Sequence, residues 1–333
     1  PVAEDLPFPA VTRVQAREAQ PPLALPPVYE ARFDRNWAIS SYSALVRNAA
    51  WGPGGSGQVA PRAILEDEPD EPDQAAAGSV APGRPGAQPW HRFPRGAFAG
   101  NFLHDLLEWL ANEGFALDTS TSLQQALARR CERQGWGHRT DDVLAWLRMV
   151  CTTPLQALGA PLVALASVTP EMEFWFPSDG LQAGWVDSLC RQYLQPGRPR
   201  PELPERSLKG MLMGFADLVF EHEGRYWVLD YKSNALGPKD ADYTIAAMES
   251  AMLEHRYDVQ AALYLLALHR LLRARLGASY EPAQHLGGAI YHFLRGVGSA
   301  TGGCCHVEPP LELLDAMDEM LLPSTHGLAG VTA

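Results

Sequence analysis

The sequence predicts an α/β fold in which a mixed β-sheet is flanked by helices. Residues 211–221 and 225–231 have the composition of two strands, and the His-Glu-Gly between them predicts a hairpin turn. Residues 241–254 and 257–276 repeat apolar side chains at helical spacing, and residues 287–294 are a short apolar run typical of a buried strand. Strands in one block, followed by helices and a further strand, indicate a mixed sheet with helical layers.

The N-terminal part of the chain predicts little regular structure. Residues 1–51 are expected to be a Pro-rich tether that ends, from residue 37, in an extended piece and a short helix, and Ser40 or Ser41 is the candidate N-cap of that helix. Residues 52–96 are rich in Gly, Pro, Ala and acidic side chains, so they bury too little apolar surface to offset the entropy of ordering. We expect 52–96 to be a flexible, linker-like insertion.

The pattern changes at residue 97, and residues 97–325 are expected to form the domain that carries the chemistry. A first helix begins near residue 97, with Gly114 as its C-terminal stop, and residues 326–333 are expected to be a C-terminal tail. The other upstream and terminal elements predicted from periodicity are helices near 121–133, 140–151 and 311–322 and a strand at 171–177.

Composition restricts the class of protein. The net charge is −12 and the pI about 5.3, which argues against nucleic-acid binding by bulk electrostatics alone. No apolar run reaches eighteen residues and no signal peptide follows Pro1, so we expect a cytoplasmic protein without a membrane partner, and a start at Pro suggests a fragment or a processed product. The five cysteines lack metal-site or disulfide spacing, and no G-x-x-x-x-G-K-[ST] motif predicts an ATP site.

The sharpest pattern is G-F-A-D-L-V-F followed by V-L-D-Y-K-S, which contains Asp217, Asp230 and Lys232. The two aspartates lie on adjacent predicted strands, and Lys232 shares a strand face with Asp230. Burying these charges is costly unless they pair or bind metal, and Mg²⁺ suits carboxylates together with a substrate phosphate. The three residues therefore suit metal-assisted hydrolysis of a phosphodiester.

The alternative for this pattern is an ion pair on the surface of an edge strand. Alternation argues against it, because Val228 shares a face with Asp230 and Lys232 in an otherwise apolar strand.

A basic stretch precedes the strand pair. Its members are Arg191, Arg198, Arg200, Arg206 and Lys209. It is a candidate for guiding a nucleic-acid strand, and an ordinary solvated loop is the equally weighted alternative.

Three separated blocks extend this pattern: GFADLVFEHEGRYWVLDYKSNALG, RYDVQAALYLLALHRLLRARL and GGAIYHFLRGV. In that order they closely resemble the C-terminal nuclease domains of RecB proteins, within the PD-(D/E)XK nuclease superfamily. The resemblance covers about residues 97–322, and a weaker similarity is found at WAISSYSAL. It implies a restriction-endonuclease-like sheet and a Mg²⁺-dependent deoxyribonuclease of the RecBCD (exodeoxyribonuclease V) type, active in double-strand break processing and recombinational repair.

The resemblance also implies roles for individual residues. His104 in GNFLH, Asp217, Asp230 and the backbone carbonyl of Tyr231 match metal ligands of the family, and Lys232 matches the motif lysine. A surface or capping histidine is the alternative for His104.

Three further site residues follow from the same resemblance. Glu173 is our choice for the acid upstream of the strand pair, with Glu171 as the alternative. Gln260 and Tyr264 match a Q-x-x-x-Y pattern, and their i,i+4 spacing places both on one helix face, where a polar pair at a helix–sheet boundary is the alternative. No cysteine precedes His104, so we expect no iron–sulfur cluster.

Partners implied by the resemblance are DNA single strands delivered by a helicase motor, the RecC and RecD subunits, and the RecA recombinase. A different class of function remains open, namely a protein-interaction module that docks on RecC and loads RecA through the helices at 241–276. A stand-alone repair or restriction nuclease with the same core is a third possibility.

Overall fold

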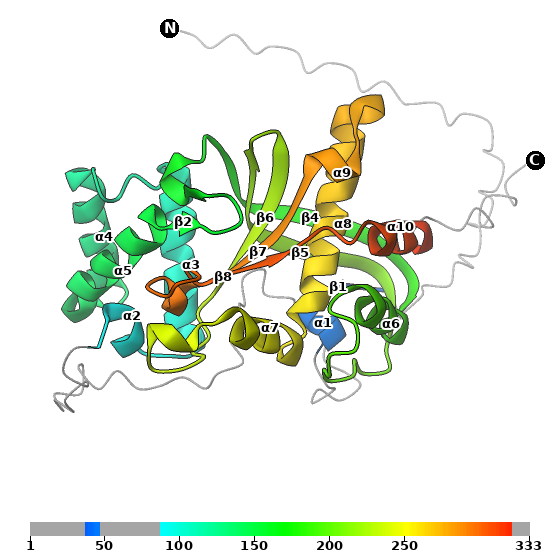
Figure 1. The fold of residues 1–333 in the computed structure, drawn as a ribbon, viewed down its shortest axis with the longest axis horizontal. Coiled ribbons are helices and arrows are strands. Elements are labelled where there is room, and N and C mark those ends of the chain that lie inside the picture. The colour runs from blue at the N-terminus through cyan, green and yellow to red at the C-terminus, as the bar shows by residue number, and fades with distance from the viewer. Residues whose placement is uncertain (1–36, 47–86, 322–333) are drawn as a thin grey trace, which may run out of the picture. The chain divides into compact units, whose positions relative to one another are not determined.

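The computed structural model describes residues 37–46 and 87–321, and these contain a six-stranded mixed sheet with helices on both faces (Figure 1). The sheet order is β1-β5-β6-β7-β8, with β4 paired to β5. The β1–β5 and β6–β7 pairs are parallel, and the remaining pairs are antiparallel. The strands of this sheet are β1 (Ala38–Ser41), β4 (Ser167–Gln182), β5 (Ser207–His222), β6 (Arg225–Lys232), β7 (Leu286–Phe293) and β8 (Cys304–Val307).

The helices divide between two apolar cores, one on each face of the sheet. One core packs α3, α4 and α5 against the sheet, and the other packs α6, α7, α8 and α10 against the opposite face (Figure 1). The helices are α1 (Tyr42–Val46), α2 (Pro89–Arg92), α3 (Ala97–Asn112), α4 (Thr121–Arg133), α5 (Thr140–Thr152), α6 (Ala183–Tyr193), α7 (Ile245–Glu254), α8 (Tyr257–Leu276), α9 (Pro282–His285) and α10 (Leu311–Met320), and a two-stranded ribbon pairs β2 (Pro154–Leu155) with β3 (Ala160–Pro161).

The long strand β5 creates a fork in the sheet. Its register with β4 runs along almost its whole length. On its other edge, residues 210–213 pair with β1 and residues 218–222 pair with β6. Residues 214–217 lie between these two partners, so an opening forms in the sheet at this point. Gly214 is required here, because a Cβ at this position would meet the ring of Phe174 at 2.2 Å.

Most predicted elements are confirmed, including the hairpin between β5 and β6. His222 pairs with Arg225, and the two turn residues, Glu223 and Gly224, have φ angles of 52° and 78°. Positive φ at both central residues matches the right-handed twist of the flanking strands and is typical of a two-residue hairpin. The observed mixed sheet with flanking helices confirms the predicted fold class.

The folded region begins upstream of residue 97, which differs from our expectation for 52–96. Trp90 and Phe93 are buried in the core formed by α3, α4 and α5, and Arg295 donates hydrogen bonds to the backbone carbonyls of Trp90, Phe93 and Pro94. The two buried aromatic side chains and the hydrogen bonds from Arg295 thus fix this Pro-rich segment to the core. The rest of 52–86 and the 326–333 tail lie outside the described residues.

Other elements were missed or incompletely predicted. The extended piece expected before the short helix is β1, which pairs with β5 in the main sheet, a pairing that we had not predicted. The helices α6 and α9 and the short strands β2, β3 and β8 were not predicted. In β8 the adjacent Cys304 and Cys305 are both buried, and they belong to opposite cores. No helix in the described ranges is long and apolar enough to span a membrane.

Candidate active site

The two motif aspartates lie at the fork of the sheet. The β5–β6 register ends at the pair Leu218–Leu229, so Asp217 and Asp230 are the next residues on their strands. Instead of a strand-to-strand bond, the backbone N–H of Tyr231 donates to Asp217 Oδ2 at 2.7 Å. The diverging strands therefore bring both carboxylates together at an opening in the sheet.

Asp230 belongs to a closed ring of four polar side chains. Lys232 Nζ lies 2.7 Å from Asp230 Oδ2 and donates to Gln260 Oε1 at 3.1 Å. Gln260 Nε2 donates to the Tyr264 hydroxyl at 2.8 Å, and that hydroxyl donates to Asp230 Oδ1 at 3.1 Å. Gln260 and Tyr264 therefore reach the aspartate and the lysine of the motif, as their spacing on one face of α8 predicts.

His104 approaches the fork from the other face of the sheet. It is a buried residue of α3, and its Nδ1 lies 3.4 Å from Asp217 Oδ2. Its ring meets the Tyr231 ring edge-on, with centroids 5.9 Å apart. The apolar stripe of α3 packs on the sheet and so turns His104 towards Asp217. The predicted site residues His104, Asp217, Asp230, Tyr231, Lys232, Gln260 and Tyr264 all meet here.

The two carboxyl groups have opposite pKa shifts. Burial, with a contribution from Asp217, raises the pKa of Asp230 to about 6, although Lys232 acts in the other direction. Burial also raises the pKa of Asp217, but His104, the Tyr231 N–H and Lys232 outweigh it and hold the pKa below its ordinary value. One acid of the pair is therefore ionised well below neutral pH, and the other ionises only as the pH approaches neutrality.

Burial acts differently on the two neighbours of Asp230. It lowers the pKa of Lys232, but Asp230 outweighs this effect and keeps that pKa above its ordinary value. Burial, followed by Asp230, raises the pKa of Tyr264 well above its ordinary value. At neutral pH the lysine is charged and the tyrosine hydroxyl keeps its proton, so both can donate hydrogen bonds to the site.

The upstream acid is not placed as we had chosen. Glu173 is exposed and lies opposite Phe215 in the β4–β5 register. Glu171 and Asp217 lie between the registered pairs Pro170–Leu218 and Met172–Ala216, and the φ of 49° at Glu171 marks a local irregularity in β4. Because Glu171 is level with Asp217 along the two strands, its position favours it over Glu173 as the acid near the fork. In E-M-E-F the two acids are two residues apart, so strand alternation predicts the same face for both. The sequence alone therefore could not distinguish them.

The donors at the fork suit a divalent cation. Two carboxylates, an imidazole and a backbone carbonyl are oxygen and nitrogen ligands of the kind that such ions take. Within 37–46 and 87–321, no group of three or more His, Cys, Asp or Glu side chains is arranged as a ready metal site. Asp230 Oδ2 instead contacts Lys232, and Asp217 Oδ2 accepts from Tyr231. The donor set still fits a cation, because two buried carboxylates lie together at the fork with a single lysine beside them.

One residue near Lys232 was missed by the sequence analysis. Tyr257 places its ring 3.9 Å from Lys232 Nζ, measured to the ring centroid. It lies three residues before Gln260 and seven before Tyr264, so all three share a face of α8. That spacing was a usable indication in the sequence.

The basic stretch upstream of β5 does not form a free guiding surface. Arg200 is buried and pairs with Asp258 at 2.7 Å, while Arg191 pairs with Asp187 at 3.0 Å. Arg198 pairs with Glu249. These three arginines form ion pairs within the fold, and the buried Arg200 differs from both expectations, the guiding surface and the ordinary solvated loop.

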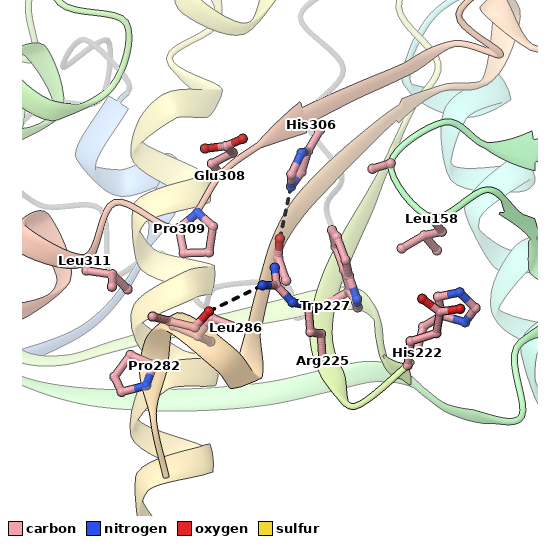
Figure 2. A pocket seen from close by; sticks show the side chains of 14 residues that line it. Leu158, His222, Arg225, Trp227, Pro282, Leu286, His306, Glu308, Pro309 and Leu311 are labelled. Carbon is pink, nitrogen blue, oxygen red and sulfur yellow. Dashed lines mark hydrogen bonds between the residues drawn. The ribbon is translucent and has the colours of Figure 1, made fainter.

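A depression at the opposite end of β6 contains none of the candidate residues. It is lined by residues of the β5–β6 turn and of the segments around β7 and β8, including Arg225, Trp227 and His306. In Figure 2 His306 is hydrogen bonded to the Gly287 backbone, and the Trp227 ring stands beside it. Hollow shape alone therefore does not mark the site of the chemistry in this fold.

The sequence of the chain is similar to those of RecB subunits of RecBCD enzymes. The chain is 40% identical to the RecBCD enzyme subunit RecB of Escherichia coli over 87% of its own length and 24% of that protein. It is 32% identical to RecB of Mycolicibacterium smegmatis over 96% of its length and 32% of that protein, and 29% identical to RecB of Mycobacterium tuberculosis over 88% and 29%. The chain thus spans between a quarter and a third of the length of these relatives.

The family itself is shown by a match over most of the chain. Residues 91–313 match the description "PD-(D/E)XK nuclease superfamily", and this range runs from α2 into α10 and contains every residue of the fork. The chain belongs to the PD-(D/E)XK nuclease superfamily.

Proposed function

We propose that this domain hydrolyses phosphodiester bonds of DNA with Mg²⁺, as the nuclease part of a RecBCD-type helicase–nuclease in double-strand break processing. The observation that carries the proposal is the fork, where the ring of Asp230, Lys232, Gln260 and Tyr264 adjoins Asp217. A structural ion pair needs no second carboxylate beside it, whereas a metal site for phosphodiester hydrolysis can use both.

The residues proposed to hold Mg²⁺ are His104, Asp217, Asp230 and the carbonyl of Tyr231, with Glu171 in preference to Glu173 as the upstream acid. When bound, the ion supplies Lewis acidity towards a phosphate oxygen and lowers the pKa of a coordinated water.

Lys232 is proposed to stabilise charge on the phosphate. Its ammonium remains protonated at neutral pH and can donate to a non-bridging oxygen or to the attacking water. Gln260 and Tyr264 hold this ammonium and the Asp230 carboxylate at fixed places, since each donates or accepts within the ring. Preorganisation of this kind avoids reorganisation during the reaction.

The wider setting is part of the same proposal. The named relatives are RecBCD subunits, so we propose a bacterial, cytoplasmic complex with RecC and RecD, and exchange with RecA. A net charge of −12 gives the domain little general attraction for DNA. Delivery of a single strand by a motor would meet that need.

The test is cleavage of end-labelled single-stranded DNA with Mg²⁺ by the parent chain, by Asp230→Ala and by Asp315→Ala. Asp315 is an exposed acid on α10 and serves as the matched control. We expect cleavage by the parent and by Asp315→Ala, and loss in Asp230→Ala and in EDTA. Equal cleavage by all three proteins would remove Asp230 from the site. A parent that is silent both alone and within the full complex would favour the interaction-module function.

A further inference from the structure

The ammonium of Lys232 has two oxygen neighbours and two aromatic neighbours, of which the ring of Tyr291 is the more distant, with its centroid 5.5 Å from Nζ. Asp230 Oδ2 and Gln260 Oε1 lie at 2.7 and 3.1 Å. The nearer ring is that of Tyr257, whose centroid is 3.9 Å from Nζ. This distance is well inside the range at which the negative face of an aromatic ring attracts a cation.

Tyr257 is itself fixed in place. It is the first residue of α8 and is buried. Its hydroxyl donates to Asn234 Oδ1 at 3.3 Å, its carbonyl accepts from the Tyr291 hydroxyl at 3.1 Å, and its ring stacks on that of Tyr291. A side chain with this many restraints offers a rigid surface to a flexible lysine.

The residue before it adds a further restraint. Arg256 has a left-handed φ of 58°, and its guanidinium pairs with Asp258 and Asp187. These ion pairs fix the start of α8, so the position of the Tyr257 ring is set by buried charges outside the fork.

We propose that Tyr257 is a positioning residue that holds the Lys232 ammonium against Asp230 and Gln260 through the face of its ring. A lysine side chain has four rotatable carbons and gains no fixed direction from its own shape. Two oxygen contacts alone do not fix the ammonium in one place, and the face of the ring adds a further contact. For cleavage this inference rests on the function proposed above.

The competing explanation is that Tyr257 is only a core residue. In that case its replacement would lower stability but leave the surroundings of Lys232 unchanged in the folded protein. Two substitutions separate these explanations. Tyr257→Phe keeps the ring and loses the hydroxyl, whereas Tyr257→Leu keeps apolar bulk and loses the ring.

The first test does not depend on cleavage activity. The small number of lysines in the chain makes the signals easy to assign. The only lysines are Lys209, Lys232 and Lys239. In protein labelled with ¹³C,¹⁵N-lysine, three side-chain systems are therefore observed by NMR, and Lys232→Ala identifies the one from the fork. A ring face close to Nζ shifts the ε-methylene protons upfield.

We expect this upfield shift in the parent and in Tyr257→Phe, and a large decrease in Tyr257→Leu, where only the more distant Tyr291 ring remains. Tyr280→Leu, which removes a tyrosine at the far end of α8, should leave the Lys232 resonances unmoved. A folded Tyr257→Leu protein with unmoved Lys232 resonances would overturn the inference.

The second test is steady-state cleavage of single-stranded DNA by the same variants. We expect Tyr257→Leu to lower kcat about tenfold at nearly unchanged KM, because a misplaced group costs rate more than binding. Tyr257→Phe should restore kcat to within about twofold, given that the ring face supplies the attraction.

The two tests together keep this inference separate from the proposed function. A large decrease of the NMR shift with full cleavage by Tyr257→Leu would overturn a positioning role in the reaction. A parent without cleavage would contradict the proposed function, and the NMR result would still decide whether Tyr257 holds Lys232.

Discussion

Two buried clusters of charge meet near the start of α8, and they are built differently. The arginine cluster consists of Arg191, Arg200, Arg256, Asp187 and Asp258, with ion-pair distances of 2.7–3.0 Å. The fork cluster consists of Asp217, Asp230, Lys232, Gln260, Tyr264 and His104. Both bury carboxylates, so burial alone does not distinguish a functional site from a structural one.

The balance of charge distinguishes them. In the arginine cluster three guanidinium groups face two carboxylates, and backbone carbonyls accept further hydrogen bonds, such as those that Arg200 donates to Leu194 and Gln195. In the fork cluster two carboxylates face one lysine, and burial raises the pKa of Asp230 to about 6. Guanidinium groups outnumber carboxylates in the first cluster, whereas carboxylates outnumber the lysine in the second, where an added cation would balance the charge.

The largest expected effect is on stability and lies in the arginine cluster. Asp258→Ala leaves two buried guanidinium groups without their shared carboxylate, so we expect a loss of about 3–5 kcal/mol in the free energy of unfolding. Urea denaturation of the parent, Asp258→Ala and the exposed control Asp315→Ala measures it. A loss below about 1 kcal/mol would contradict the expectation that the ion pairs of Asp258 stabilise the fold.

The next effect is on cleavage and lies in the fork. Lys232→Met removes the only lysine of the site, and we expect kcat for DNA cleavage to fall about 10²–10³-fold, as for loss of one electrostatic stabiliser. Lys239→Met, at an exposed position, is the matched control and should cleave like the parent. Similar kcat values for the two variants would contradict a catalytic role for Lys232.

A smaller effect separates the two upstream acids. If Glu171 is the acid that joins Asp217, Glu171→Gln should lower kcat about tenfold or more, and Glu173→Gln should change it less than about twofold. Single-turnover cleavage of both variants decides the order. The reverse order would restore Glu173, our choice from the sequence, and would show that the register of β4 misled us.

The smallest effect is the pH dependence of metal binding. A carboxyl group with a pKa of about 6 is mostly protonated at pH 5 and mostly ionised at pH 7. Since a ligating carboxylate must lose its proton, Mg²⁺ affinity should rise about tenfold between pH 5 and pH 7 and level off above. Calorimetric titration at both values measures the change, and equal affinities would contradict the raised pKa of Asp230.

The sequence predicted the parts of the site that follow from strand and helix periodicity. Alternation in β6 placed Asp230 and Lys232 on one face, and the i,i+4 spacing placed Gln260 and Tyr264 together; both relations are confirmed in the structure. The roles of these residues stay predictions. Contacts that need the fold itself were not predictable, as shown by the fork that opens in β5 between its pairings with β1 and β6.

Buried polar residues were the main source of difference. Arg200 lies in a Pro-rich loop, whose composition predicts an exposed side chain. It is buried because it pairs with Asp258, which lies far along the chain on α8. Arg295 likewise follows a buried strand and donates to the carbonyls of Ser233, Trp90, Phe93 and Pro94. Each of these partners lies far away along the chain, so local patterns could not reveal them.

The most direct test of the account is whether a divalent cation stabilises the folded protein through the fork. We would measure the thermal unfolding midpoint of the parent and of Asp230→Asn without DNA, with and without Mg²⁺ or Mn²⁺. The account predicts that the cation raises the midpoint of the parent and leaves that of Asp230→Asn unchanged, because a ligand that binds the folded state stabilises it. An equal rise in both proteins, or none in the parent, would contradict a metal site built on Asp230.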